Sequence, residues 1–457
     1  MSKLWKLLGS MLVLLTCFPF VSYGDNPIIT DVFTADPATL VYDGTCYVYV
    51  GHDENDAPNT GYKMVDWKVY SSTDMINWTD RGTALTTKTF SWSGGDANAA
   101  QCIYRNGKFY WYVSTHDKTN PGVAIGVAVS DSPTGPFKDA LGRALITNDM
   151  TKYASHSWDD LDPTVFIDDD GQAYLYWGNK ACYWVKLNDD MISLKGAITA
   201  IPITKEAFGP GFEEAPWLYK RNGLYYLLYA SGFPESIAYS TSSSPAGPWT
   251  YRGIIMKPTP TSTTIHPAIV DYKGASYFLY HNGSLPGGGS YKRSVCIEKF
   301  QYNSDGTIPL ITDTTTGLNG TMNRIKSYNF QNMYWRNTNF NVKIEANVTP
   351  ATDQFWQVVP GLADSTDGNV SFRSVYYPGY YLRQNNNELK LEKHDGSTKF
   401  SKDATFKKVP GLKDSGWSSF QSFAAPDLYI RHSNYTLRMS AISTDLDRQD
   451  ATFGIGK

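Results

Sequence analysis

Five stretches of this sequence resemble one another, and their spacing constrains the fold more than any other feature. Each begins with a polar or charged residue, continues into an apolar run, turns at a glycine and ends in an aromatic strand. Aligned on that glycine, the leading residues are separated by 62, 64, 52 and 52 positions, and they are Asp36, Asn98, Asp162, Glu214 and His266. Such a period, with several short strands per unit and no helical pattern, predicts a five-bladed β-propeller.

The leading residues of the five units should meet at one place. The first strand of each propeller blade lines the central channel, so we expect these side chains to converge on an axial pocket. Three of the five are carboxylic acids and one is a histidine. A single Asp before Pro can simply cap a turn, but acids at three of five equivalent positions indicate a functional site.

The pattern changes after the fifth unit. Residues 311–325 are polar and rich in Thr, Asn and Gly, which is typical of a linker or closing segment. Beyond it, DQFWQVVPGL, DATFKKVPGL and DATFGIG begin at Asp353, Asp403 and Asp450, at spacings of 50 and 47 residues. Three such units predict a β-trefoil. The chain is therefore expected to be all-β, with a propeller at 25–315, a linker at 316–326 and a trefoil at 327–457.

The N-terminus has the pattern of a secretory signal peptide. Lys3 and Lys6 precede an apolar run over 7–21, and small residues at Ser22 and Gly24 predict cleavage after residue 24. The run is short for a membrane span, and Thr before Cys17 makes a poor lipid-anchor site. We therefore expect a secreted protein, extracellular or periplasmic, without a membrane span.

Charge and cysteine usage exclude several classes of function. The net charge is −3 and no basic block occurs, which argues against nucleic-acid binding. The cysteines that would remain after export show no spacing typical of a zinc site, and they are Cys46, Cys102, Cys182 and Cys296. Export permits disulfides, but a chain with a large core does not need them, so buried free thiols are favoured.

Three carboxyl groups in one pocket suit the hydrolysis of glycosides. That reaction uses one protonated carboxyl group to donate to the leaving oxygen and one carboxylate on the opposite face of the sugar. A third carboxylate near the acid raises the pKa of the acid by like-charge repulsion and keeps it protonated near neutral pH.

The first 310 residues resemble the glycoside hydrolases of family 43, which are five-bladed propellers that act with inversion. The ADP motif at Asp36 resembles the general-base motif of that family. Asp162, in DDLDPTVF, resembles the residue that orients the acid and modulates its pKa, and Glu214, in FEEAPW, resembles the general acid. The neighbouring Glu213 is expected to point away, because alternate strand residues face opposite sides.

Two further residues follow from the same resemblance. It implies that His266 lies on the propeller axis, either as a buried structural histidine or near a calcium ion or its water. Calcium prefers oxygen ligands, and no acidic loop is dedicated to it, so no cofactor is required and a structural calcium ion stays an open alternative. Arg293, in GGGSYKRSVC, resembles the arginine that contacts the substrate.

The second unit departs from the family pattern. Related enzymes carry Trp where Asn98 stands, followed three positions later by a residue that Gln101 matches. We expect Trp92, in TFSWSGGDANAAQ, to supply the missing aromatic platform for the sugar. These three residues are therefore candidates for substrate binding.

Residues 327–457 resemble the arabinofuranose-binding β-trefoil of B-type arabinofuranosidases, carbohydrate-binding module family 42. In that family a His after Tyr-x-Arg and the Asp of DATF hold a side-chain sugar. Only the third unit keeps both, as His432 and Asp450. The first unit pairs Asn337 with Asp353 and the second pairs Gln384 with Asp403, so at most one pocket matches fully.

These resemblances imply an exported inverting glycoside hydrolase, acting as a monomer on plant cell-wall polysaccharide. The module favours an α-L-arabinofuranosidase that releases arabinose from arabinoxylan or arabinan. The propeller by itself leaves β-xylosidase, arabinanase and exo-β-galactanase open, because one fold serves many substrates. A non-catalytic carbohydrate-binding protein is the alternative from another class, and the presence of all three carboxyl groups argues against it.

Overall fold

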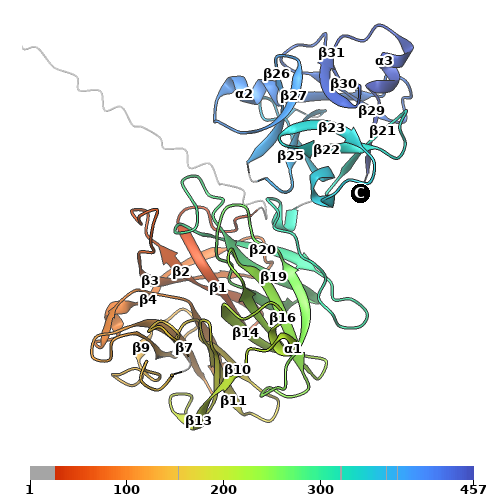
Figure 1. Ribbon diagram of the computed structural model, residues 1–457. Helices are drawn as coiled ribbons and strands as arrows, with labels where there is room; N and C mark the ends of the chain where they lie inside the picture. Colours follow the sequence, from red (N-terminus) through yellow and green to blue (C-terminus); the bar gives the residue numbers. More distant parts are fainter. Residues whose placement is uncertain (1–25, 153, 320–321, 367, 378, 457) are drawn as a thin grey trace, which may run out of the picture.

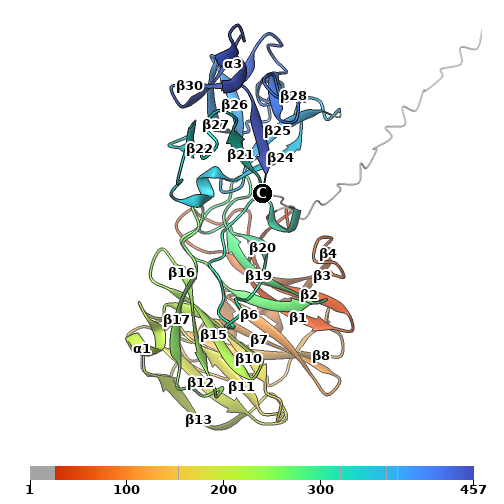
Figure 2. The same cartoon turned by 90° about the vertical axis from the view of Figure 1, so that its right-hand side faces the viewer.

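A computed structural model describes residues 26–152, 154–319, 322–366, 368–377 and 379–456. It consists of two β-domains, a propeller followed by a smaller C-terminal domain that lies against one end of it (Figures 1 and 2). The predicted signal segment 1–24, including Cys17, lies outside the described residues. Within them, no helix is long and apolar enough to cross a membrane.

The N-terminal domain has five antiparallel sheets, one for each predicted repeat, so the predicted propeller is confirmed. Blade one contains β1 (Phe33–Tyr42), β2 (Thr45–Asp53), β3 (Met64–Ser72) and β4 (Thr79–Thr86). Blade two contains β5 (Ser93–Gly95), β6 (Ala100–Arg105), β7 (Lys108–Asp117), β8 (Val123–Ser130) and β9 (Lys138–Asp139). A single 3₁₀ turn, η1 (Thr87–Thr89), connects the two blades.

The remaining blades repeat the same order. Blade three contains β10 (Thr164–Ile167), β11 (Ala173–Trp177), β12 (Cys182–Leu187) and β13 (Leu194–Ile201). After the short helix α1 (Lys205–Phe208), blade four contains β14 (Glu214–Arg221), β15 (Leu224–Ser231), β16 (Ser236–Ser242) and β17 (Thr250–Met256). Blade five contains β18 (Ala268–Tyr272), β19 (Ala275–Asn282) and β20 (Ser294–Phe300).

Aromatic strands fill the space within and between the blades. Trp67, Trp111 and Trp177 are fully buried, and the other buried aromatic residues of the repeats pack in the hydrophobic clusters of the propeller. Most of the aromatic share of the sequence is thus used for packing, because flat rings cover the pleated faces of neighbouring sheets well. The four cysteines of the blades are free and buried, as expected for thiols in a large core.

The chain segment before β1 closes the ring. Its backbone runs beside β20, with the Ile28 amide donating to Val295 at 2.9 Å and the Thr34 amide donating to Arg293 at 2.9 Å. The buried side chain of Asn26 donates to the Ile297 carbonyl at 3.1 Å and accepts from the Ile297 amide at 2.8 Å. Closure removes the free edge that the three-stranded fifth sheet would otherwise expose.

The C-terminal domain has threefold repetition, in agreement with the predicted trefoil. Its strands are β21 (Arg324–Ser327), β22 (Tyr334–Thr338), β23 (Asn341–Glu345), β24 (Trp356–Pro360), β25 (Asn369–Ser374), β26 (Tyr380–Asn385), β27 (Glu388–Lys393), β28 (Phe406–Pro410), β29 (Ser418–Ser422), β30 (Tyr429–Ser433), β31 (Thr436–Ser440) and β32 (Phe453–Gly456). Its short helical turns are η3 (Ala351–Gln354), α2 (Thr398–Asp403) and α3 (Asp445–Asp450).

Three hairpin turns interlock around the threefold axis. Each has two consecutive residues with positive φ, as two-residue hairpins of the right-handed twist require. The carbonyl of the second of these residues accepts an amide from the next unit, at 2.8–2.9 Å, in a closed cycle: Phe340 from Leu391, Asn387 from Met439 and Tyr435 from Ile344. Every unit therefore holds the next one.

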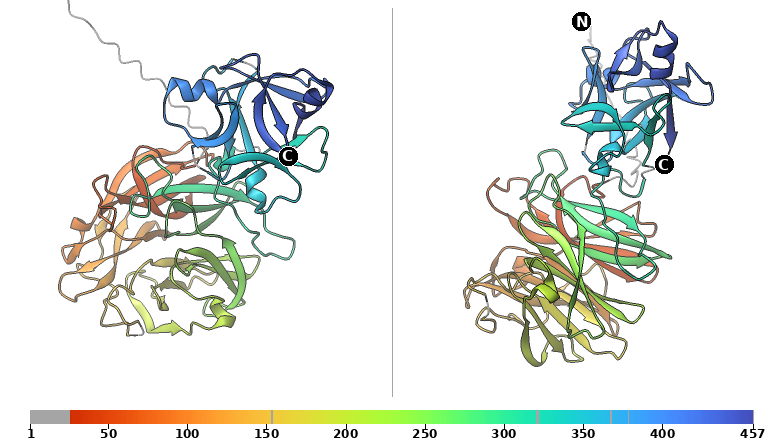
Figure 3. Two further views of the ribbon diagram at one scale, coloured as in Figure 1. Left: turned by 45° about the horizontal axis from the view of Figure 1, so that its top comes forward. Right: turned by 45° about the vertical axis from the view of Figure 1, so that its right-hand side comes forward.

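The segment between the domains is packed rather than loose. Thr315 donates from its amide to Val375 at 3.1 Å and from its hydroxyl to Ser374 at 2.9 Å. Thr316 is buried, and η2 (Gly317–Asn319) follows it (Figure 3). The first trefoil strand starts at Arg324, inside the expected linker 316–326, because it pairs with the last strand of the chain, β32.

We predict that Asn26→Ala destabilises the propeller by about 3 kcal/mol. The change leaves buried partners of the Asn26 amide, at Ile297 and Thr314, without hydrogen bonds. Asn303→Ala is the control, since Asn303 is exposed and donates only to Thr307 at 2.9 Å; it should change stability by less than about 0.5 kcal/mol. Denaturant unfolding measures both. Equal stability of the two variants would contradict the closure argument.

Candidate active site

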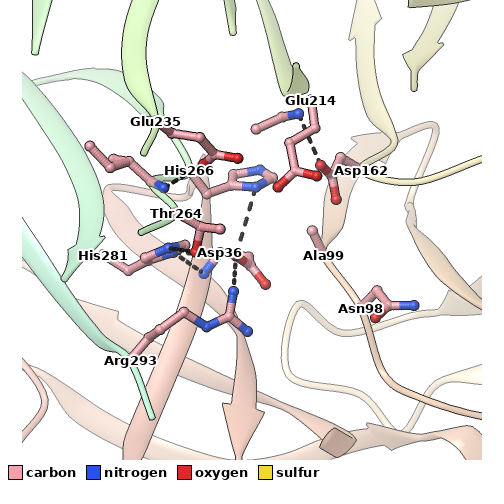
Figure 4. A network of polar contacts seen from close by, with 12 residues as sticks. Asp36, Asn98, Ala99, Asp162, Glu214, Glu235, Thr264, His266, His281 and Arg293 are labelled. Carbon is pink, nitrogen blue, oxygen red and sulfur yellow. Dashed lines mark hydrogen bonds and ion pairs between the residues drawn. The ribbon is translucent and has the colours of Figure 1, made fainter. Parts of the chain in front are cut away.

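A cavity of about 430 Å³ opens at the end of the propeller where the first strands begin. Residues from all five blades line it: Asp36, Tyr62, Met64, Asp96, Asn98, Ala99, His116, Val123, Trp158, Leu161, Asp162, Asn179, Glu213, Glu214, Phe233, Glu235, Thr264, His266 and Arg293. The five leading residues of the repeats are all among them. Figure 4 shows Asp36, Asp162 and Glu214 pointing toward the same space from different blades.

Asp36 is held as a carboxylate at the bottom of the cavity. It is 6% exposed, and its Oδ1 lies 2.9 Å from Arg293 Nη1 and 3.2 Å from His281 Nδ1. Burial by itself raises the pKa of Asp36, but the guanidinium of Arg293 and the nearby imidazoles outweigh it, so the pKa lies well below its usual range. Asp36 is therefore ionised at neutral pH.

Arg293 lies on the loop before β20, as the sequence predicted, but it faces acids rather than open space. Its guanidinium forms two hydrogen bonds of 2.9 Å with Asp53, and the Tyr62 ring covers it at 4.6 Å. Asp53 is fully buried at the end of β2. One cation thus neutralises two buried carboxylates, one in the cavity wall and one behind it.

The surroundings of Asp162 and Glu214 favour the protonated form of each carboxyl group, in contrast to those of Asp36. Burial, followed by the charge of Glu214, raises the pKa of Asp162 well above its usual range. Burial also raises the pKa of Glu214, although Asn179 opposes the shift by donating to Glu214 Oε2 at 2.6 Å. Asp162 Oδ2 accepts the Ala215 amide at 2.9 Å, so it fixes the backbone beside Glu214. This side of the cavity favours protonated carboxyl groups.

The same backbone feature directs these acids inward. Asp36, Asp162 and Ala215 each precede a proline and each have positive φ, at 51°, 60° and 57°. At the first and third of these positions the strand pairing shifts register, which marks a β-bulge. Bulges re-aim side chains and recur beside functional sites. In blades one, three and four, the strained residue before the proline thus directs the acid at or beside it toward the axis.

Two other residues that the sequence predicted also line the cavity. His266 lies with Nδ1 3.8 Å from Asp36 Oδ1, and burial lowers its pKa to about 4, so its ring is neutral. Asn98 lines the opposite wall. Glu213 does not point away, contrary to expectation, because it precedes β14 and strand alternation does not apply to it. It lies at the rim and forms an ion pair with Lys180.

The structure corrects the placement of two residues of the second unit. Trp92 is 7% exposed, packs against Phe90 in the core and donates its indole N–H to Asp139 at 3.1 Å. It does not line the cavity, because the turn before β5 directs it toward the outer strands. Gln101 is equally buried, and its amide bonds the backbone of Val165 on blade three. Both residues pack blades together.

The alignment of the five repeats did not identify several residues that belong to the site. Asp53, Asn179, Glu235 and His281 come from the second strand of a repeat or from the turn that follows it. His281 accepts the Asp36 amide with Nδ1 at 3.2 Å, while its Nε2 lies 3.1 Å from the Thr264 hydroxyl. The signal was a polar residue just after an aromatic strand, as in YLYWGN and FLYHN.

The residues around His266 do not fit a calcium ion. Calcium takes six to eight oxygen ligands, whereas the carboxylate within 4 Å of His266, Asp36, is already paired with Arg293. The positive charge of Arg293 opposes a second cation there. Among the described residues, no group of three or more His, Cys, Asp or Glu side chains could hold a metal ion.

The third unit of the trefoil brings its predicted pair together. His432 Nε2 lies 3.3 Å from Asp450 Oδ1, and Asn329 bonds both side chains. The rings of Phe330 and Tyr435 lie beside this pair. The group therefore combines a neutral imidazole, whose pKa burial lowers, with an acid and two aromatic rings.

The other two units have an amide, Asn337 or Gln384, where the third unit has the imidazole of His432. In the first, Asp353 bonds Arg336 at 2.8 Å, and the Phe340 ring packs against Tyr377. In the second, Asp403 bonds Arg383 at 3.2 Å, and Gln384 accepts from Ser422 at 2.7 Å. All three aspartates, including Asp450 with Arg431, also serve as partners of an arginine within their unit.

Comparison with known proteins places both domains. Residues 24–308 match "Glycosyl hydrolases family 43", and residues 323–455 match "Alpha-L-arabinofuranosidase B (ABFB) domain". A xylosidase/arabinosidase of Bacteroides ovatus is 33% identical over 320 residues, which cover 60% of this chain and 94% of that protein. An arabinoxylan arabinofuranohydrolase of Bacillus subtilis is 32% identical over 346 residues, which cover 64% of this chain and 65% of that protein.

Solved structures agree with this placement. A family-43 β-xylosidase/α-arabinofuranosidase from a compost microbial metagenome has a TM-score of 0.56 at 32% identity, over 63% of this chain and 97% of that one. An α-L-arabinofuranosidase of Clostridium thermocellum has a TM-score of 0.51 at 38% identity, over 62% and 96%. The family match covers more than half of the sequence. The chain belongs to glycosyl hydrolase family 43, carries a C-terminal arabinofuranosidase-B domain, and is a glycoside hydrolase.

Proposed function

We propose that this glycoside hydrolase is an inverting α-L-arabinofuranosidase that releases arabinose from arabinoxylan or arabinan. One observation carries the proposal: a single cavity holds an ionised carboxylate, Asp36, and a carboxyl group with a raised pKa, Glu214. An inverting enzyme needs a base and an acid of these two kinds, roughly 6.5–9.5 Å apart, with room for a water molecule between base and sugar. The arabinofuranosidase-B domain supports arabinofuranose as the sugar.

In this proposal each side chain has one task. Asp36 takes a proton from water as the water oxygen bonds to the anomeric carbon. Glu214 gives its proton to the leaving oxygen, which keeps the electron pair of the broken C–O bond. Asp162 holds the Ala215 amide and, through its carboxyl group beside Glu214, keeps the acid in place. Arg293 and the neutral His266 bound the cavity next to Asp36.

The mouth of the cavity suits a polymer rather than a free sugar. The rings of Phe233 and Trp158 are 68% and 51% exposed there, although both line the cavity. Exposed aromatic rings offer flat faces on which sugars of a chain can stack.

Hydrolysis of β-D-xylosides is the second candidate function, because relatives are named as xylosidase/arabinosidase. We also propose, from the Lys3–Gly24 sequence, that the enzyme is exported.

The test of the sugar is a matched pair of aryl glycosides, the α-L-arabinofuranoside and the β-D-xyloside. We predict that wild type cleaves the arabinofuranoside faster, and that Glu214→Gln loses at least about 10³-fold in kcat on it, because an amide N–H is not acidic enough to transfer its proton to the leaving oxygen. NMR of the first product formed should show the inverted anomer. Faster cleavage of the xyloside would be compatible with the proposed mechanism but would identify xylose as the preferred sugar. A product with retained anomeric configuration, or an active Glu214→Gln variant, would refute the acid–base assignment.

We predict that Asn179→Ala moves the alkaline limb of the kcat/KM profile upward by about 1 pH unit. Activity is lost as pH rises through the pKa of Glu214, and the bond from Asn179 lowers that pKa by favouring the carboxylate. Without it the pKa rises further, so the acid stays protonated to higher pH. Asn188→Ala, in an outer turn bonded to Ser193, is the control. A downward or absent shift would contradict the assignment of Glu214.

We predict that His432→Ala weakens retention on arabinoxylan and leaves turnover of a small aryl glycoside unchanged. His432 belongs to the one unit with an imidazole, an acid and two rings, which together suit a sugar's hydroxyl groups and apolar face. Gln384→Ala changes the equivalent position of the second unit and should leave retention as in wild type. Affinity electrophoresis in arabinoxylan gels compares the two. Equal retention of both variants would mean that His432 and Asp450 have a structural role and do not bind the polysaccharide.

A further inference from the structure

A fourth carboxyl group lies in the wall of the cavity and has no task in the reaction described above. Glu235 stands immediately before β16, after the turn that carries Phe233 to the cavity mouth. Its side chain lines the cavity, although the residue is only 2% exposed. Figure 4 shows its carboxyl group directed toward Glu214 and His266.

Backbone and side-chain contacts fix the orientation of Glu235. Its amide donates to the Thr263 carbonyl at 2.9 Å, and its Oε2 accepts the Ile265 amide at 2.7 Å. The carboxyl groups of Glu235 and Glu214 point toward each other in the cavity wall (Figure 4). Two neighbouring buried carboxyl groups repel each other when both are ionised, so the pair favours a state in which at least one member is protonated.

The surroundings of Glu235 favour its neutral form. Within the described parts of the chain, no Lys, Arg or His lies within ion-pair distance of it, whereas a buried carboxylate without a cation is costly. The other charged and titratable groups that line the cavity are Asp36, Tyr62, Asp96, His116, Asp162, Glu213, Glu214, His266 and Arg293. His116 is paired with Asp96. Arg293 is engaged with Asp36 and Asp53, and Lys180 with Glu213. Burial and the charge of Glu214 accordingly raise the pKa of Glu235 well above its usual range.

We propose that Glu235 is a positioning residue that stays protonated and donates a hydrogen bond to the carboxylate that Glu214 becomes when it gives up its proton. The proposal rests on the proposed role of Glu214 as the acid. In the reaction the O–H bond of Glu214 breaks, its proton bonds to the leaving oxygen, and the negative charge stays on Glu214. Asn179 and Glu235 then donate to that charge from protein groups already in place, without reorganisation.

The return step needs no other reactant than water. Solvent in the cavity reprotonates Glu214, while Glu235 keeps its own proton throughout. Asp36, which received a proton from the attacking water, releases one proton to solvent. One proton is therefore taken up for each one released, and the cavity returns to its first state.

The first test compares two substitutions of the same side chain. Glu235→Gln keeps an oxygen for the Ile265 amide and an N–H for Glu214, so it should retain most of the wild-type kcat. Glu235→Ala loses the donor, so kcat should fall roughly 10- to 100-fold with KM unchanged. The alkaline limb should move to higher pH in Glu235→Ala only, since the Glu214 carboxylate has lost a partner. Glu206→Ala, on the exposed surface of α1, is the control.

Either of two kinetic results would overturn the proposal. One is a Glu235→Gln variant that is as impaired as Glu235→Ala. That result would mean that the enzyme needs an ionisable carboxyl group at position 235 and not a hydrogen-bond donor. The other is full activity of Glu235→Ala. A second measurement needs neither turnover nor the alanine variant: the infrared band of a protonated carboxyl group at neutral pH, which should be present in wild type and weaker in Glu235→Gln. If that band is unchanged, the proposal fails even if the enzyme is active. If the band behaves as expected but no glycoside is cleaved, the proposed function fails instead.

Discussion

The ion pair between Asp36 and Arg293 is the interaction on which the rest of the site depends. Arg293 is the cation that balances two buried carboxylates, Asp36 and Asp53, and it is itself buried. Because its charge is used on that side, the carboxyl groups across the cavity, Asp162 and Glu214, are left without a cation. The same residue thus makes one acid ionised and leaves the others to be neutral, which is the asymmetry that acid–base catalysis requires.

Much of this arrangement could be predicted from the sequence, because the propeller repeats one motif. The alignment of five glycine turns located Asp36, Asp162, Glu214 and His266, and the structure brings all of them into one cavity. Self-comparison works here because equivalent positions of a repeat become neighbours on an axis. The X-Pro dipeptides were visible in the sequence, whereas the positive φ that turns each side chain inward was not.

The site residues that were wrongly predicted or overlooked from the sequence have a common physical cause. Trp92 and Gln101 were assigned to the sugar because aromatic and amide groups suit both sugars and cores, and only the direction of the backbone decides between them. Asp53 and Glu235 were overlooked because Asp53 ends the second strand of its blade and Glu235 lies in the turn after one, outside the first-strand motif on which the repeats were aligned. Sequence repetition identifies the first ring of side chains around the axis but not the groups behind it that set their charge.

Closure of the propeller is what makes the site possible at all. Asp36 and Arg293 are 257 residues apart in sequence and belong to the first and last blades. They meet because the segment before β1 runs along β20, where the Thr34 amide bonds the Arg293 carbonyl and Asn26 bonds Ile297. The base therefore acquires its cation only when the ring is closed, whereas Asp162 and Glu214 belong to adjacent blades and need no closure to meet. A chain with an open ring would keep Asp162 and Glu214 together but would lose the charge of Arg293 that keeps Asp36 ionised. Ionisation of the base therefore depends on the contacts between the first and last blades that close the ring.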